Sequence, residues 1–211
     1  MPAPLTGRAA WAGAELDRSG DLIRTLDAAH CAELDAALRA VETSGAPLFG
    51  FGRADFPLPR TAILLAEIAE ELEHGRGMVR LRGLPVQRYT EDQLRRIFWG
   101  IGRHLGTAVY QNATGEIMGE VRDETRLAAK TYDEAAEGEV ASARARSRST
   151  GPLRWHTDRC DVIALMCVSN AQAGGVSKLA SIATIHNEIL ARRPDLLDLL
   201  RQEYWRARPA D

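Results

Sequence analysis

The chain has 211 residues, 45% hydrophobic and 27% charged, which is the composition of an ordinary globular domain. Its formal net charge of -2 provides no basic field for nucleic acid or an anionic membrane surface. The three cysteines lack CxxC spacing, the N-terminus lacks a signal-peptide pattern, and no apolar run could span a bilayer, so we expect a reduced, cytoplasmic protein.

An N-terminal arm and two helices are the first predicted elements. Residues 1–25 are expected to form a loosely attached arm, ahead of a single domain over residues 26–211. After Asp27, apolar residues recur at helical spacing until Gly45, and a second apolar stripe predicts a helix that ends near Gly75. The stretch between them, "LFGFGRADFPLPR", is predicted to be a loop because of its glycines and prolines.

The middle of the chain alternates between strand and helix patterns. The stretch "GMVRLRGLP" alternates apolar and basic residues, which predicts a strand. Thr90 and Gln93 form a capping-box pattern, so a helix is expected from there to Gly106. The stretch "EIMGEVR" is predicted to be another strand.

The last third begins with small polar residues at 134–151, which predict a mobile loop. The apolar run "VIALMCV" favours a strand buried on both faces, and a turn at Gly174 and Gly175 leads to a short strand at 178–181. Helices are expected near 184–192 and from Pro194. Helices that precede strands indicate an α+β fold.

The stretch "LRWHTDRCD" contains the candidate chemistry. Residues two positions apart on a strand share a face, so His156 and Asp158 could present an imidazole nitrogen and a carboxylate oxygen to one metal ion. A third ligand would complete the 2-His-1-carboxylate arrangement of non-haem Fe(II) enzymes. Cys160 has the same parity, so a His-Asp-Cys site is a further alternative, although a lone cysteine is more often a small buried apolar residue.

The order of "WHTD", an apolar strand and "GGVS" resembles the taurine dioxygenase-like (TauD/TfdA) family of Fe(II)- and 2-oxoglutarate-dependent oxygenases. The upstream "LRGLP", "GRHLG" and "YQNATGEIMGEVRDE" are also similar to that family, so the resemblance covers about residues 77–200. It implies a double-stranded β-helix, or jelly roll, with flanking helices, which this chain contains only as an N-terminal portion.

The resemblance also implies roles for five residues. His156 and Asp158 would be the first two iron ligands, and Ser177 would contact 2-oxoglutarate. Gln111 and Asn112 lie where the family builds a wall of the substrate pocket. No catalytic residue beyond the metal ligands is expected, because Fe(II) and 2-oxoglutarate carry the redox chemistry.

The family's second histidine ligand and its arginine for 2-oxoglutarate come from later strands, and we find no match for either here. His186 and Arg201 are the nearest substitutes, but His186 lies in a helical pattern at a position where the family has no ligand. Three explanations are open: a truncated product, a subunit completed by another chain, or a degenerate family member. Unpaired sheet edges would in each case favour association.

We therefore expect a dioxygenase that hydroxylates a small organic substrate with O2, partnered by a further copy or a completing chain, and binding neither nucleic acid nor membrane. The alternative is a non-catalytic or truncated family member that serves as a binding or assembly module. A zinc hydrolase would also lack a ligand. Nucleic-acid binding through the arginines at 144–148 is the weakest alternative, because no aromatic platform accompanies them.

Overall fold

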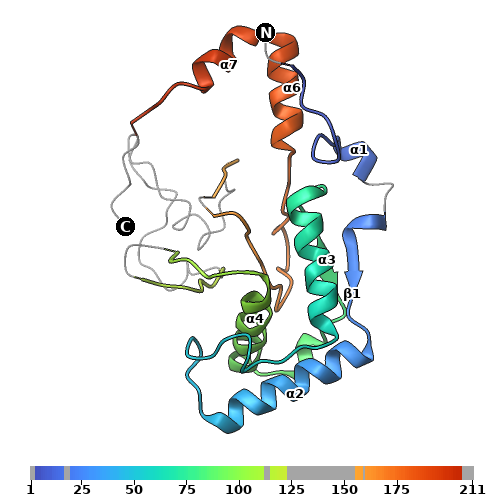
Figure 1. Ribbon diagram of the computed structural model, residues 1–211, viewed down its shortest axis with the longest axis vertical. Helices are drawn as coiled ribbons and strands as arrows, with labels where there is room; N and C mark the ends of the chain where they lie inside the picture. The colour runs from blue at the N-terminus through green and yellow to red at the C-terminus, as the bar shows by residue number, and fades with distance from the viewer. Residues whose placement is uncertain (1–2, 17–19, 112–114, 123–154, 159, 206–211) are drawn as a thin grey trace. The chain divides into compact units, whose positions relative to one another are not determined.

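The computed structural model describes residues 3–16, 20–111, 115–122, 155–158 and 160–205. The chain divides into two compact units: unit 1 contains Met1–Thr107 and Ala164–Gln202, and unit 2 contains Ala108–Ile163 and Glu203–Asp211. All of the described helices and strands belong to unit 1. Figure 1 labels most of them along the chain. The loop expected at 134–151, with its arginines, lies outside the described residues.

Helix α2 (Ala28–Ser44) confirms the first helix prediction at both ends. The Asp27 side chain accepts a hydrogen bond from the His30 amide, and the His30 ring bonds the Asp27 amide in return. Gly45 ends the helix in the left-handed region, with φ 68°, a conformation that glycine adopts without strain. The apolar stripe of α2 is buried, with Leu34 fully inaccessible.

Helix α3 (Thr61–His74) is capped from another element. Its own N-cap residue, Arg60, makes no capping hydrogen bond through its side chain. The carboxylate of Glu33, on α2, instead accepts from the backbone amides of Arg60 and Thr61, each at 2.7 Å. The Thr61 hydroxyl donates to the same carboxylate at 2.5 Å. This contact joins the two helices at the start of α3.

Helix α4 (Glu91–Leu105) begins with the predicted capping box, in which Thr90 and Gln93 bond each other's backbone amides. It packs against both α2 and α3 (Figure 1). Gly100 lies against the ring of Phe56, so closely that a methyl group at Gly100 would lie 2.5 Å from a ring carbon. The helix therefore approaches the core through a residue without a side chain.

The loop between α2 and α3 supplies part of this core. Phe51 and Phe56 stack with ring centroids 5.8 Å apart, and Phe56 and Leu58 are almost fully buried. Trp99 of α4 donates its indole N–H to the Phe51 carbonyl at 2.9 Å. The sequence predicted this stretch as a loop, which is correct, but its role in the core was not foreseen.

A short parallel pair of strands lies beside the helices. β1 (Ile23–Thr25) pairs with β2 (Arg80–Arg82), in the register Ile23 to Arg80. The centre of the strand predicted around residues 77–85 is thus confirmed, whereas β1 falls within the expected arm. Three short helices complete this part of unit 1: α1 (Gly13–Leu16), η1 (Gly20–Leu22) and η2 (Val86–Arg88).

The prediction of three further strands, at 116–122, 162–168 and 178–181, is wrong for the structure as described. A strand forms only where a neighbouring strand takes its backbone N–H and C=O groups. The sheet found among the described residues contains only β1 and β2. The run expected to be buried on both faces is accordingly exposed, with Leu165 76% accessible.

The C-terminal helices confirm their predictions: α6 (Ile182–Arg192) begins at the N-cap Ser181, and α7 (Pro194–Leu200) has Pro194 in its first turn. The expected loose attachment of the arm is not observed, because its described residues hydrogen-bond to α6 and to the end of α3. Within the part of the chain that can be described, no helix combines the length and apolar character of a bilayer crossing.

Candidate metal-binding site

His156 and Asp158 lie in unit 2, outside any helix or strand, with their side chains close together. His156 Nε2 is 3.8 Å from Asp158 Oδ2. Both side chains are accessible, 38% for His156 and 48% for Asp158, and the preceding Trp155 is 69% exposed. The two groups that the sequence singled out thus share one accessible side of the backbone.

The separation of these two donors is close to what one metal ion requires. Two donors about 2.1 Å from a metal and at right angles to each other lie about 3.0 Å apart. The observed 3.8 Å therefore needs a closure of less than 1 Å, which side-chain rotation of exposed groups provides. A neutral imidazole and a carboxylate are donors that suit divalent iron. The pair fits two positions of such a site.

A third ligand is not found next to this pair in the described residues, where no group of three His, Cys, Asp or Glu side chains is arranged to hold a metal. Cys160 is half-buried and does not complete such a group. His186 is in unit 1, on α6; its Nδ1 lies 3.2 Å from Asn187 Oδ1 and its Nε2 lies 3.5 Å from Arg201 Nη2. These contacts agree with a helix-surface histidine.

Ser177, expected to contact 2-oxoglutarate, lies in unit 1 in an exposed stretch without helix or strand. It follows Gly174 and Gly175, whose φ angles of 76° and 68° form the turn that the sequence predicted. Left-handed backbone at both positions explains the two glycines. The structure does not test the role of Ser177, which stays a prediction.

Of the two residues expected at the substrate pocket, Gln111 belongs to unit 2 and is exposed. Its side-chain amide donates to the Val109 carbonyl at 3.1 Å, and its backbone N–H donates to the Glu116 carbonyl at 2.6 Å. Asn112 lies outside the described residues. Their expected role at the substrate is therefore untested.

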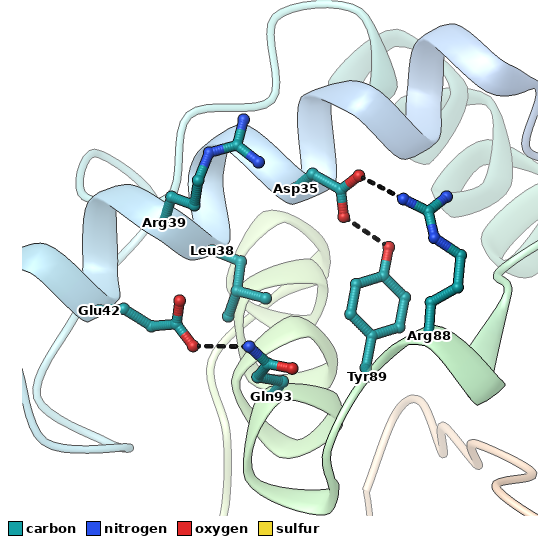
Figure 2. Close-up of a pocket in the computed structure, with 7 residues that line it drawn as sticks. All are labelled: Asp35, Leu38, Arg39, Glu42, Arg88, Tyr89 and Gln93. Atoms are coloured by element: carbon teal, nitrogen blue, oxygen red, sulfur yellow. Dashed lines mark hydrogen bonds and ion pairs between the residues drawn. The ribbon is translucent and has the colours of Figure 1, made fainter.

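A hollow of about 210 Å³ lies between α2 and the start of α4. Figure 2 shows Asp35 on one side of it, accepting hydrogen bonds from the Tyr89 hydroxyl at 2.8 Å and from Arg88 at 3.2 Å. On the other side Gln93 donates to Glu42 at 3.0 Å. These contacts join α2 to the start of α4 and to the residues just before it, so the polar groups that line the hollow bond one another across this junction.

Sequence reasoning missed a set of polar residues on α6 that bind the N-terminal arm. Ser181, Thr184 and Asn187 recur every third residue, which places them along one side of the helix. They contact backbone atoms of residues 5–11. Small polar side chains at every third position were the available signal, but their partner lies more than 170 residues away in the sequence.

Comparison with known proteins adds two relatives and a family. The chain is 33% identical over 197 residues to "FR-33289 synthase" of Streptomyces rubellomurinus, which covers 93% of this chain and 55% of that protein. It is 30% identical over 202 residues to "Taurine hydroxylase-like protein SAT17" of Stachybotrys chartarum, which covers 95% of this chain and 51% of that protein. The chain thus spans about half the length of both relatives.

The family profile described as "Taurine catabolism dioxygenase TauD, TfdA family" matches residues 43–211. That match includes His156, Asp158 and Ser177, and it extends the resemblance seen in the sequence toward both ends of the chain. The family implies a jelly-roll fold. The helices and the two parallel strands described here neither confirm nor contradict that fold. On this match, the chain belongs to the TauD/TfdA family of dioxygenases.

Proposed function

We propose that this chain is part of an Fe(II)- and 2-oxoglutarate-dependent dioxygenase that hydroxylates a small organic substrate. The observation that carries the proposal is the His156–Asp158 pair, with its donors 3.8 Å apart and accessible, in a chain that belongs to the TauD/TfdA family. The name of one relative, a taurine hydroxylase-like protein, supports hydroxylation as the reaction class.

In this proposal, His156 and Asp158 hold Fe(II), and Ser177 contacts 2-oxoglutarate through its hydroxyl. Gln111 and Asn112 form part of the substrate wall. Iron with 2-oxoglutarate supplies the oxidising chemistry: one oxygen atom of O2 enters the substrate C–H bond, and the other enters succinate as 2-oxoglutarate loses CO2. The protein's own side chains bind, orient and shield the reactants.

The pair alone does not provide enough ligands for tight metal binding. Because two protein ligands hold a divalent ion weakly, we infer that a further histidine completes the site. It must come from outside these 211 residues, because the other four histidines of the chain all lie in described ranges and none forms a three-ligand group with the pair.

The test is an anaerobic titration of the chain with 2-oxoglutarate and a large excess of Fe(II), which compensates for the weak binding by two protein ligands. The visible metal-to-ligand charge-transfer band is followed. We expect the band in the wild-type chain and its loss in His156→Ala and Asp158→Asn. The matched control is His74→Ala, which removes an exposed histidine from the last turn of α3, in unit 1. The control should keep the band.

A chain that shows no band, or a band that survives both substitutions at the pair, would contradict the proposed role of His156 and Asp158. Near-normal folding of the variants is expected, since both side chains are more than a third exposed. Far-ultraviolet circular dichroism and the unfolding midpoint check this point.

A second function, a non-catalytic binding or assembly module, is favoured by one observation: the described residues contain no three-ligand cluster. Such a module would bind a protein partner or a second copy without consuming 2-oxoglutarate. Conversion of 2-oxoglutarate to succinate by the purified chain in the presence of Fe(II) and O2 would exclude it. Stable association with neither iron binding nor turnover would support it.

A further inference from the structure

The N-terminal arm is bound to α6 through its backbone. Asn187 accepts a hydrogen bond from the Leu5 N–H at 2.7 Å and donates to the Leu5 carbonyl at 2.8 Å. Thr184 donates its hydroxyl to the Trp11 carbonyl at 2.7 Å. Main-chain atoms are the partners in all three contacts, so α6 holds the arm by its backbone at two points, on either side of the turn at residues 7–10.

The same arm is also attached to the body of unit 1. The Trp11 ring is buried, with 8% of its surface accessible, and its indole N–H donates to the Arg76 carbonyl at 2.9 Å. Arg8 forms an ion pair of 2.7 Å with Glu71, a side chain of α3 that is only 6% exposed. Trp11 thus bonds the turn after α3 through its ring and α6 through its carbonyl.

Helix α6 packs mainly against α7. The arm therefore provides much of the attachment of α6 to the rest of unit 1. Between the start of α6 and the turn after α3 lies a hollow of about 290 Å³, lined by Leu179–Ala183 on one side and Arg76–Met78 on the other. Ala9 and Trp11 of the arm also line this hollow, so the arm lies where the two sides meet.

The residues just before α6 are those that matter for the proposed site. Residues 176–180 are exposed, and the first anchored residue after them is Ser181, which is 6% accessible and donates its hydroxyl to the Ala9 carbonyl at 2.5 Å. Ser177 is four residues before that anchor. Its position is therefore set by how firmly the arm holds the N-terminus of α6.

We propose that residues 5–11 act as a strap that positions the segment 176–181, and that Trp11, Thr184 and Asn187 are positioning residues for the cosubstrate. The part concerning 2-oxoglutarate rests on the function proposed above for Ser177; the ordering of the segment does not. The strap would raise affinity for 2-oxoglutarate by ordering its binding segment before the ligand arrives.

Amide hydrogen–deuterium exchange tests the ordering directly. Thr184→Val keeps the shape of the side chain but removes the hydroxyl, and Asn187→Ala removes both contacts with Leu5. The first hydrogen-bonded amides of α6 are those of Thr184 and Ile185, which both bond Ser181. We expect exchange of the α6 amides at 184–189 to accelerate about fivefold for each hydrogen bond lost. Exchange in α2 and α3 should stay as in the wild type, which shows that the variants remain folded.

Two control variants sharpen this measurement. Thr184→Ser keeps the hydroxyl and should retain wild-type protection, and Thr43→Val makes the same threonine-to-valine change at an exposed position of α2. Unchanged exchange of the α6 amides at 184–189 in both Thr184→Val and Asn187→Ala would overturn the strap. The same increase in Thr43→Val would overturn it as well, because the effect would not be specific to the arm.

The functional part is tested by the dissociation constants of 2-oxoglutarate and Fe(II), measured separately by anaerobic equilibrium dialysis. We expect weaker 2-oxoglutarate binding by Thr184→Val and Asn187→Ala, about fivefold to tenfold each, with Fe(II) binding unchanged. Faster exchange together with wild-type 2-oxoglutarate affinity would overturn the positioning role. If the wild-type chain binds no 2-oxoglutarate, the proposed function fails, and the exchange result alone decides whether the strap orders the segment.

Discussion

The cap that α2 provides for α3 allows a quantitative prediction. In Glu33→Ala, three donors lose their acceptor: the backbone amides of Arg60 and Thr61 and the hydroxyl of Thr61. Arg60 is exposed, so water can replace the lost acceptor there. Thr61 is fully buried, so its amide and hydroxyl remain without a partner.

Each buried donor left unsatisfied costs about 1–3 kcal/mol, so we expect Glu33→Ala to lower the free energy of unfolding by about 3 kcal/mol. A urea denaturation curve at pH 7 measures this loss. The double variant Glu33→Ala/Thr61→Val removes the stranded hydroxyl together with its acceptor. It should therefore lose about 1–2 kcal/mol less than the sum of the two single variants.

The effect should also depend on pH. Burial of the Glu33 carboxyl opposes ionisation, but the hydrogen bonds from the Thr61 hydroxyl and the two amides outweigh burial and lower the pKa of Glu33. A lowered carboxyl pKa contributes stability above the ordinary value of 4.5, and this is lost as the pH falls through the folded-state pKa. The difference between wild type and Glu33→Ala should therefore shrink below pH 4.5.

The matched control is Glu70→Ala, which removes an exposed carboxylate from α3 itself and should change stability by less than about 0.5 kcal/mol. If Glu33→Ala costs no more than this control, the cap does not stabilise α3 and the reasoning is refuted. The same holds if the double variant loses the full sum of the single losses, because no coupling between Glu33 and Thr61 would then exist.

Three further outcomes follow from individual contacts. Gly100→Ala would place a methyl group 2.5 Å from the Phe56 ring, so it should lower the free energy of unfolding, measured in urea, by about 1–3 kcal/mol. Gly102→Ala, in the same helix, meets nothing within 4 Å and should raise that free energy by up to about 1 kcal/mol. Burial and a hydrogen-bonded carboxylate raise the pKa of Tyr89 to about 12, so Tyr89→Phe should remove an ionisation near pH 12 from an ultraviolet titration of the folded chain. His156→Ala should lower the unfolding free energy by less than about 0.5 kcal/mol, since 38% of that side chain is exposed; a larger loss would indicate a structural role.

Helix ends were predictable from the sequence because their causes are local. Asp27 and Gly45 bracket α2, and Thr90 with Gln93 begins α4, and each acts on backbone groups within a few residues. The cap on α3 was not predictable, since Glu33 is 28 residues from Thr61 and no local pattern connects them. For the same reason the burial of Phe56 inside a loop escaped the helical and strand periodicities.

The strand predictions failed for a different reason, because a strand also needs a partner to pair with. The run at 162–168 has the composition of a buried strand, but composition does not supply the neighbour that makes a strand. The candidate metal pair was foreseeable because His156 and Asp158 are two residues apart, and their proximity survives without a sheet, at 3.8 Å. Ser177 was identified through a resemblance alone, because no periodicity connects it to the pair.

The two parts of the proposed site therefore depend on the chain in different ways. The metal pair is set by its own short stretch, so changes elsewhere in the chain should leave the contact between His156 and Asp158 intact. Ser177 lies in an exposed segment whose nearest anchor, Ser181, binds the Ala9 carbonyl 172 residues away. The position of Ser177 should therefore change when the arm is altered or removed. Loss of the first eleven residues should consequently impair cosubstrate binding and leave the metal pair unaffected, which separates the two halves of the site by experiment.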